Sequence, residues 1–201
     1  MHAVNAIKQL YEVNMEDDPY DDSGFVEVLE HWGEKTVWDE IQFFMAPLKG
    51  RVLDIACGTG IVIDILSKFE NIDVYGFDSS HSCIEKAIGR GIEQNKVMIN
   101  DATHLKYDDK EFDYSYSIGS IEHIKDIDLA IKECDRVTKF KSFHLLPITA
   151  HVDDEGWIYK GRQYYYNNTV NWWMSKLEKH FDVVVLESRL EDCMWFICES
   201  K

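Results

Sequence analysis

The sequence predicts an α/β fold: a doubly wound, mainly parallel seven-stranded sheet with a C-terminal antiparallel hairpin and helices on both faces. Three observations predict it. Short apolar runs alternate along the chain with segments whose apolar residues recur at helical spacing, the turn Gly58-Thr59-Gly60 follows the first run, and two further runs end the chain with a short polar break between them. Because parallel neighbours need crossover connections, which are overwhelmingly right-handed, helices are expected on both faces.

The first half of the chain alternates regularly. A helix is expected at residues 36–46, where apolar side chains recur at helical spacing until Pro47 and Gly50 stop the run. Short apolar runs predict strands at 51–55, 72–77 and 97–99. The segments between them predict helices at 61–69 and 81–88.

The second half continues this pattern and then changes. Strands are expected at 112–118 and 143–148, on either side of a helix at 127–137. The inward face of that helix is predicted to carry Leu129, Ala130, Ile131, Cys134 and Val137. A helix at 169–180 then precedes strands at 183–186 and 194–198, and the short break between these strands predicts the hairpin.

Composition limits the class of protein. With 201 residues, 45% of them hydrophobic, we expect one domain over residues 1–201. The formal net charge of −16 would repel phosphate backbones and anionic lipid head groups, so neither nucleic acid nor a membrane surface is an expected partner. Five cysteines without a CxxC pair, and no targeting or membrane-spanning apolar segment, predict a cytoplasmic location.

Residues 1–34 are expected to form an N-terminal cap or lid. Acidic residues crowd around Pro19 within this segment, and two interpretations stay open. The crowded stretch is either a solvated loop or a mobile segment that folds over a ligand, with Tyr11 and Tyr20 helping to line it.

The glycine turn and the acidic residues around it indicate a binding site. Gly58 and Gly60 permit close backbone approach, and the following helix presents unpaired amide hydrogens. Asp78 ends the second strand, where doubly wound sheets hold an acid that binds ribose hydroxyls. Asp101 and Ala102 follow the third strand, where a carboxylate and a backbone amide can meet the edge of an adenine ring.

Two adenosine cofactors are consistent with this arrangement. A dinucleotide fingerprint needs a third glycine where this chain has Ile63, and its pyrophosphate would be repelled by Asp54. S-Adenosyl-L-methionine carries a sulfonium and an ammonium group, which acidic side chains attract. The charges favour this second cofactor.

The run Val52-Leu53-Asp54-Ile55-Ala56-Cys57-Gly58-Thr59-Gly60 resembles the first motif of class I, Rossmann-like S-adenosylmethionine-dependent methyltransferases of the small-molecule type. Ser117 to Ile124 resembles the stretch after their fourth strand, which faces the acceptor. The resemblance covers about residues 35–140 and departs from the family at Ala56, usually glycine, and at Lys139 to Ser142, which replaces a Lys-Pro-Gly turn. It implies a cofactor site made by Asp54, Ala56, Gly58, Gly60, Asp78, Ser79, Asp101, Ala102 and Ser117.

Glu122, His123 and His151 are the predicted catalytic residues, because a methyl acceptor can need a base and these side chains follow the fourth and fifth strands. For His123 a direct role competes with capping of the next helix, and for His151 it competes with an ordinary surface loop. Asp153, another candidate base, and Asp154 fit a solvated turn better than a magnesium site, so no metal is expected.

Residues 150–168 are expected to be an insertion on the acceptor side. Aromatic residues cluster there and in the next helix, where they either line an acceptor pocket or pack in the core: Trp157, Tyr159, Tyr164, Tyr165, Tyr166, Trp172 and Trp173. The helical spacing of Trp173 and Leu177 favours the core for Trp173. The five cysteines are expected to be buried thiols.

The expected function is transfer of a methyl group to an oxygen or nitrogen atom of a small molecule, such as a sugar intermediate. A catalytically silent methyltransferase-like binding subunit, or an enzyme that transfers another group from the same kind of cofactor, are the alternatives. The acceptor and the oligomeric state are not determined by the sequence.

Overall fold

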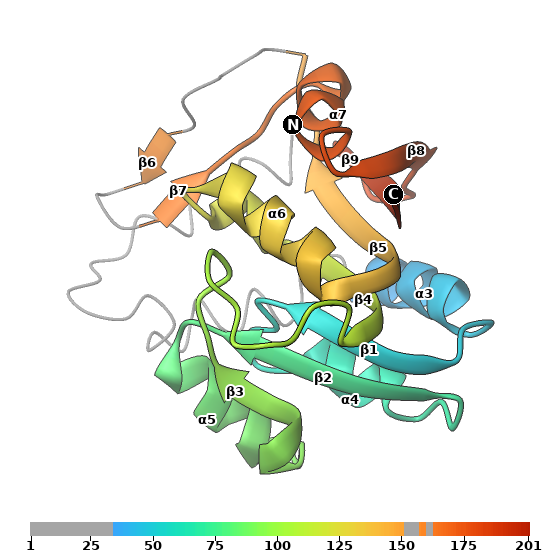
Figure 1. The fold of residues 1–201 in the computed structure, drawn as a ribbon, viewed down its shortest axis with the longest axis vertical. Coiled ribbons are helices and arrows are strands. Elements are labelled where there is room, and N and C mark those ends of the chain that lie inside the picture. Colours follow the sequence, from blue (N-terminus) through green and yellow to red (C-terminus); the bar gives the residue numbers. More distant parts are fainter. Residues whose placement is uncertain (1–33, 151–156, 160–162) are drawn as a thin grey trace.

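The computed structural model describes residues 34–150, 157–159 and 163–201. These residues form a seven-stranded sheet in the order β3-β2-β1-β4-β5-β9-β8 and a separate two-stranded ribbon, β6-β7 (Figure 1). Strands β1 to β5 are parallel, and β9 is antiparallel to both β5 and β8. The predicted fold class is confirmed. The predicted cap at residues 1–34 lies outside the described residues except for its last position.

The strands of the large sheet are β1 (Gly50–Ile55), β2 (Ile72–Asp78), β3 (Val97–Ile99), β4 (Phe112–Ile118), β5 (Thr138–Pro147), β8 (Phe181–Glu187) and β9 (Cys193–Ser200). The ribbon consists of β6 (Trp157–Tyr159) and β7 (Gln163–Tyr165). The α-helices are α3 (Glu34–Met45), α4 (Ile61–Leu66), α5 (His81–Gly89), α6 (Ile127–Val137) and α7 (Val170–Leu177). Two short 3₁₀ helices are η2 (Gln94–Lys96) and η3 (Ile121–His123).

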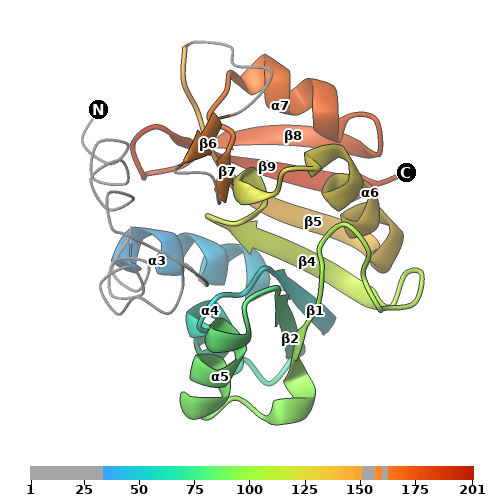
Figure 2. The ribbon, with the colours of Figure 1, turned by 90° about the vertical axis from the view of Figure 1, so that its left-hand side faces the viewer.

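Helices pack against the large sheet (Figure 2). The described residues form two hydrophobic cores, one on each face of the sheet. Leu53 and Ile55 of β1 enter the core that α6 and α7 cover, whereas Val52 enters the core beneath α3 and α4. Side chains of successive strand residues point to opposite faces, so one short apolar strand serves both cores. The carboxyl ends of β1 to β4 therefore meet at one edge, where the loops to α4, α5 and η3 begin.

The connection from α6 to β5 differs from the prediction. Helix α6 ends at Val137 and β5 begins at the next residue, Thr138, instead of at residue 143. The Lys-Pro-Gly turn is not needed here, because Thr138 already has an extended backbone (φ −98°, ψ 130°) and its hydroxyl lies 2.7 Å from Ser115 Oγ of β4.

Two further local features differ from the sequence pattern. Leu129 was expected to face the core but is 49% exposed, because the buried face of α6 is centred on Ala130 and Ile131. The ribbon β6-β7 has no predicted counterpart, since each of its strands is only three residues long.

Candidate cofactor and acceptor site

The turn after β1 combines three left-handed residues. Ala56 has φ 53°, Gly58 φ 52° and Gly60 φ 75°. A methyl group at Gly58 would meet no protein atom within 4 Å, whereas at Gly60 it would overlap Ile92 and lie 3.1 Å from Ala87 Cβ. Gly60 is therefore needed for packing against α5, and the backbone at Gly58 is open to a ligand.

Asp78 connects this turn to the next helix. Its Oδ2 accepts a hydrogen bond from Gly58 N at 2.9 Å, and its Oδ1 accepts one from Ser80 N, also at 2.9 Å. The side chain is 6% exposed. Ser80 caps α5 by accepting from Cys83 N, while Ser79 is exposed. Asp78 thus holds the glycine turn and the start of α5 in one arrangement.

Asp54 lies in β1 beside Tyr116 of β4, and both side chains are buried. Burial raises the pKa of Asp54 well above its usual value, the nearby Tyr116 hydroxyl opposes that rise, and the charge of Asp78 adds to it. Among the described residues the Tyr116 hydroxyl has no partner in hydrogen-bonding geometry. A cation near the turn would favour the ionised form of Asp54.

Asp101 lies two residues beyond β3 and is exposed. Its Oδ1 accepts from both the backbone N and the Oγ1 of Thr103 at 2.8 Å. Buried Asn100 supports the same loop, because its Oδ1 accepts from Asp101 N at 3.1 Å and from Lys106 N at 3.4 Å. Asp54, Asp78 and Asp101 therefore lie at or near the carboxyl ends of three neighbouring parallel strands, at one edge of the sheet.

Ser117 of β4 lies in the interior. Its Oγ is 2.8 Å from Nδ1 of His144, and both side chains are at most 1% exposed. His144 Nε2 is 2.8 Å from Ser142 Oγ, and burial lowers the pKa of His144 to about 3. A ligand contact at Ser117 would have to use the backbone, because the hydroxyl is already paired inside the sheet.

Glu122 and His123 form most of η3, directly after β4. Glu122 is 4% exposed, and burial raises the pKa of its carboxyl to about 7 against two opposing backbone hydrogen bonds. Its Oε2 has no hydrogen-bond partner among the described residues. The ring of His123 lies 5.2 Å from the ring of Tyr165 in β7. The loop after β4 therefore carries a buried carboxyl at Glu122, followed by a histidine that packs against a tyrosine of β7.

The aromatic cluster is partly core. Trp173 is fully buried and donates from Nε1 to Pro147 O at 3.0 Å, as the core interpretation expects. Tyr165 and Tyr166 are buried, and the Tyr166 hydroxyl donates to Lys125 O at 2.8 Å. The following positions lie outside what the structure describes of side chains: His151, Asp153, Asp154, Trp157, Tyr159 and Tyr164.

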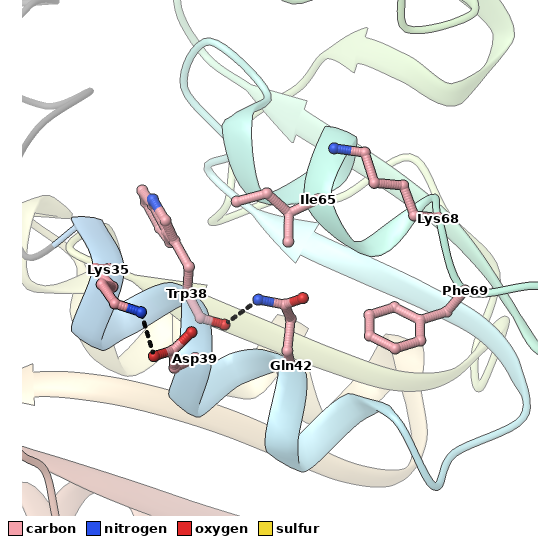
Figure 3. Close-up of a pocket in the computed structure, with 7 residues that line it drawn as sticks. All are labelled: Lys35, Trp38, Asp39, Gln42, Ile65, Lys68 and Phe69. Atoms are coloured by element: carbon pink, nitrogen blue, oxygen red, sulfur yellow. Dashed lines mark hydrogen bonds and ion pairs between the residues drawn. The ribbon is translucent and has the colours of Figure 1, made fainter.

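A separate open pocket lies between α3 and α4 (Figure 3). It has a volume of ≈ 390 Å³, and Trp38 and Gln42 of α3 line it together with Ile65 and Phe69. None of the predicted site residues contributes to it. Its ion pairs, such as Lys35 with Asp39 at 3.4 Å, are on the surface.

All five cysteines lie in the part of the chain that the structure describes. Cys57, Cys83, Cys134 and Cys198 are buried free thiols, and Cys193 is half-buried. No cluster of potential metal ligands occurs among the described residues. No helix within the described ranges combines the length and the apolar character needed to cross a membrane.

Sequence reasoning missed Tyr116 and His144. A signal for both was present, because Ser115 and Ser117 alternate with Tyr114 and Tyr116 in β4. Such alternation places the serines on one face and the tyrosines on the other. The face that carries the serines is buried, so their hydroxyl groups need polar partners, and His144 is the partner of Ser117.

The sequence of this chain is similar to those of known methyltransferases. Residues 53–146 match a methyltransferase domain family model. A ubiquinone biosynthesis O-methyltransferase of Pelagibacter ubique (strain HTCC1062) is 33% identical over 97 residues, which are 46% of this chain and 40% of that protein. The match to a sterol 24-C-methyltransferase of Schizosaccharomyces pombe covers 25% of that protein. The chain thus spans two fifths or less of the length of these curated relatives.

Solved structures extend the similarity to almost the whole chain. A methyltransferase of Haloferax volcanii, solved with the Trm112 methyltransferase activator, superimposes with a TM-score of 0.76 at 13% identity over 92% of this chain and 99% of that one. A protein of Pyrococcus horikoshii OT3 gives 0.71 at 21% identity over 96% and 99%. At these identities the likeness concerns the fold.

Residues 53–146 thus match a methyltransferase domain family, and the chain has the fold of solved methyltransferases. The expected resemblance to class I, Rossmann-like methyltransferases that use S-adenosylmethionine is confirmed.

The residues present fit that cofactor. The backbone at Gly58 is open where a ligand would approach, and its N–H donates to the buried carboxyl of Asp78. The buried carboxyl of Asp54 lies close enough to Asp78 for the two charges to interact. Asp54 carries no cationic partner in any described contact, so a positively charged ligand would complete the cluster.

Proposed function

We propose that the chain catalyses methyl transfer from S-adenosylmethionine to an oxygen atom of a small-molecule acceptor. Bound at the glycine turn, the cofactor supplies an activated methyl group on a sulfonium. Gly58 would let the backbone approach it, Asp78 would receive the ribose hydroxyls, and Asp54 would favour the positive charge. Asp101 and Ala102 meet the adenine edge.

The observation that carries the choice of oxygen is Glu122. It is a buried carboxyl with a pKa raised to about 7 and a free Oε2 in the loop that follows β4. A base of this pKa would be suited to taking the proton of a hydroxyl as the oxygen–carbon bond forms and the methyl carbon–sulfur bond breaks, which leaves a neutral thioether. The O-methyltransferase among the relatives supports the same choice. His123 and Tyr165 orient the acceptor from the side.

The first half of this proposal is tested by calorimetry with S-adenosylhomocysteine. We expect binding by the wild-type chain and a loss of about tenfold or more in affinity after Asp78→Ala, because the ribose loses a charged acceptor. Asp73→Ala, in the same strand but at an exposed position, is the matched control and should bind as the wild type does. Undetectable binding by the folded wild-type protein would refute the cofactor assignment.

The second half is tested with labelled S-adenosylmethionine and a panel of hydroxyl and amine acceptors. Label recovered on an ether oxygen supports the proposal. Label found on nitrogen alone would contradict the choice of acceptor. A product carrying another part of the cofactor would contradict methyl transfer itself.

A further inference from the structure

The loop that joins β3 to β4 is held by helix α6. This loop, residues 100–111, carries Asp101 and Ala102 at its start and runs beside α6 (Figure 1). Glu133 and Arg136 project from α6 toward it and form a bidentate pair, with Arg136 Nε to Glu133 Oε1 at 2.8 Å and Nη2 to Oε2 at 2.8 Å. Such a planar pair has a fixed geometry.

The Glu133–Arg136 pair forms hydrogen bonds with the backbone of the loop. Glu133 Oε2 accepts from Leu105 N at 2.8 Å, and Arg136 Nη2 donates to Leu105 O at 2.9 Å. Arg136 Nη1 donates to Tyr107 O and to Asp109 Oδ1, both at 2.8 Å. Both polar backbone groups of Leu105 are therefore satisfied by two side chains of one helix.

Asp101 depends on this anchor. Its carboxylate contacts Thr103 and its carbonyl accepts from His104 N at 3.0 Å, so these bonds lie within the loop itself. Asn100 N donates to Asp78 O at 3.0 Å and attaches the start of the loop to β2. Leu105, which is 5% exposed, attaches the stretch that follows Asp101 to the core and to α6. Movement of Leu105 would carry the exposed Asp101 carboxylate with it.

We propose that Glu133 and Arg136 are positioning residues for adenine recognition: they set the place of the Asp101 carboxylate at the sheet edge without touching the cofactor. This inference rests on the proposed function. Arginine is required at position 136, because a lysine ammonium cannot pair with both carboxylate oxygens and two carbonyls at once.

The test compares binding of S-adenosylhomocysteine and S-inosylhomocysteine, which differ in the 6-amino group that Asp101 would accept from. We expect the wild-type chain to prefer the adenosyl compound about tenfold or more. In Arg136→Lys this preference should fall about threefold or more, because the carboxylate is no longer held in place. Glu133→Gln, which keeps an acceptor for Leu105 N, should reduce the preference less.

Lys176→Met is the matched control. Lys176 joins α7 to α6 through Asp128 at 2.7 Å and is 21% exposed, against 27% for the Arg136 side chain, but it does not touch the loop. This change should leave the preference unaltered. Thermal unfolding shows which variants fold. If Arg136→Lys does not fold, the preference of Glu133→Gln decides the outcome.

The results separate the two claims. A wild-type chain that binds neither nucleoside contradicts the proposed function. A wild-type chain that prefers the adenosyl compound, together with folded variants that keep the full preference, refutes the positioning role alone. An equal weakening of both compounds would also refute it, because that is the result of general destabilisation.

Discussion

At the scale of single residues, the site depends on a few side chains whose surroundings differ from water. Glu122 and His144 are both buried, and burial moves their pKa values in opposite directions, to about 7 and about 3. Each value reflects the cost of placing a charge in a dry interior. Glu122 can accept a proton near neutral pH, whereas His144 stays neutral there and connects Ser117 with Ser142.

We expect Glu122→Gln to lower the methyl transfer rate about 10²-fold to 10⁴-fold at pH 8, because the base is lost. The same change should raise stability at that pH. The pKa of Glu122 in the folded protein exceeds its ordinary value of 4.5, so folding favours the protonated carboxyl. The resulting stability is fully present below pH 4.5 and is lost as pH rises through 7. The difference amounts to about 3 kcal/mol. Rates and urea unfolding of both proteins at pH 4.5 and pH 8 measure these effects.

The exposed Glu187→Gln is the control for this comparison and should change neither quantity. A wild-type rate that does not increase between pH 6 and pH 8, or an unimpaired Glu122→Gln variant, would argue against Glu122 as the base.

The two glycines of the turn offer a second comparison. Gly58→Ala should cost about 1–2 kcal/mol of stability from its positive φ and weaken S-adenosylhomocysteine binding more than about tenfold, because the methyl group enters open space beside the turn. Gly60→Ala should lose more stability, since its methyl group overlaps Ile92. Thermal unfolding and calorimetry on both variants measure this difference. Equal binding by wild-type protein and Gly58→Ala would show that no ligand approaches there.

At the scale of elements, α3 is fastened to the C-terminal hairpin by one buried carboxylate. Glu40 Oε2 accepts from Ser188 Oγ and Trp195 Nε1 at 2.7 Å, and its Oε1 accepts from Arg189 N at 2.8 Å. Burial raises the pKa of Glu40, but these hydrogen bonds lower it by more than burial raises it. The pKa of Glu40 therefore lies below its usual value. Helix α3 is thus hydrogen-bonded to the β8-β9 hairpin.

Glu40→Gln should destabilise the protein by about 3 kcal/mol, because an amide cannot accept at both ends. Asp39→Asn next to it removes only a surface pair with Lys35 and should cost less than about 0.5 kcal/mol. Urea unfolding at pH 7 compares the two. Because the folded pKa is depressed, the Glu40 contribution is present at neutral pH and is lost as pH falls through the folded value. Equal losses for both variants would contradict this assignment.

At the scale of the whole molecule, the net charge of −16 makes the folded chain repel itself. Raising monovalent salt from 20 to 200 mM shortens the screening length from about 20 to about 7 Å. We therefore expect the unfolding midpoint at pH 7 to rise with salt. At pH 5 the effect should shrink, because carboxylates begin to take up protons. A midpoint that falls with salt at pH 7 would show that specific ion pairs outweigh the general repulsion.

The fold and the position of the acids at the carboxyl edge of the sheet can be predicted from local sequence patterns. The glycine turn, the apolar strand runs and an acid such as Asp78 lie close to one another in the sequence. The periodicities of strands and helices are also local properties. Ala56 illustrates the limit: the sequence marks it as a departure from glycine, whereas its left-handed backbone (φ 53°) is visible only in the folded turn.

What the sequence by itself determined is the order of strands and helices, the family, and the acids at the carboxyl edge, because each depends on residues close together in the chain. Only the tertiary structure showed the burial of Glu122, the pairing of Ser117 with His144, and the grip of Arg136 on Leu105. Arg136 and Leu105 are 31 positions apart, and Ser117 and His144 are 27 apart. Desolvation and hydrogen bonding between such distant residues arise only when packing brings them together.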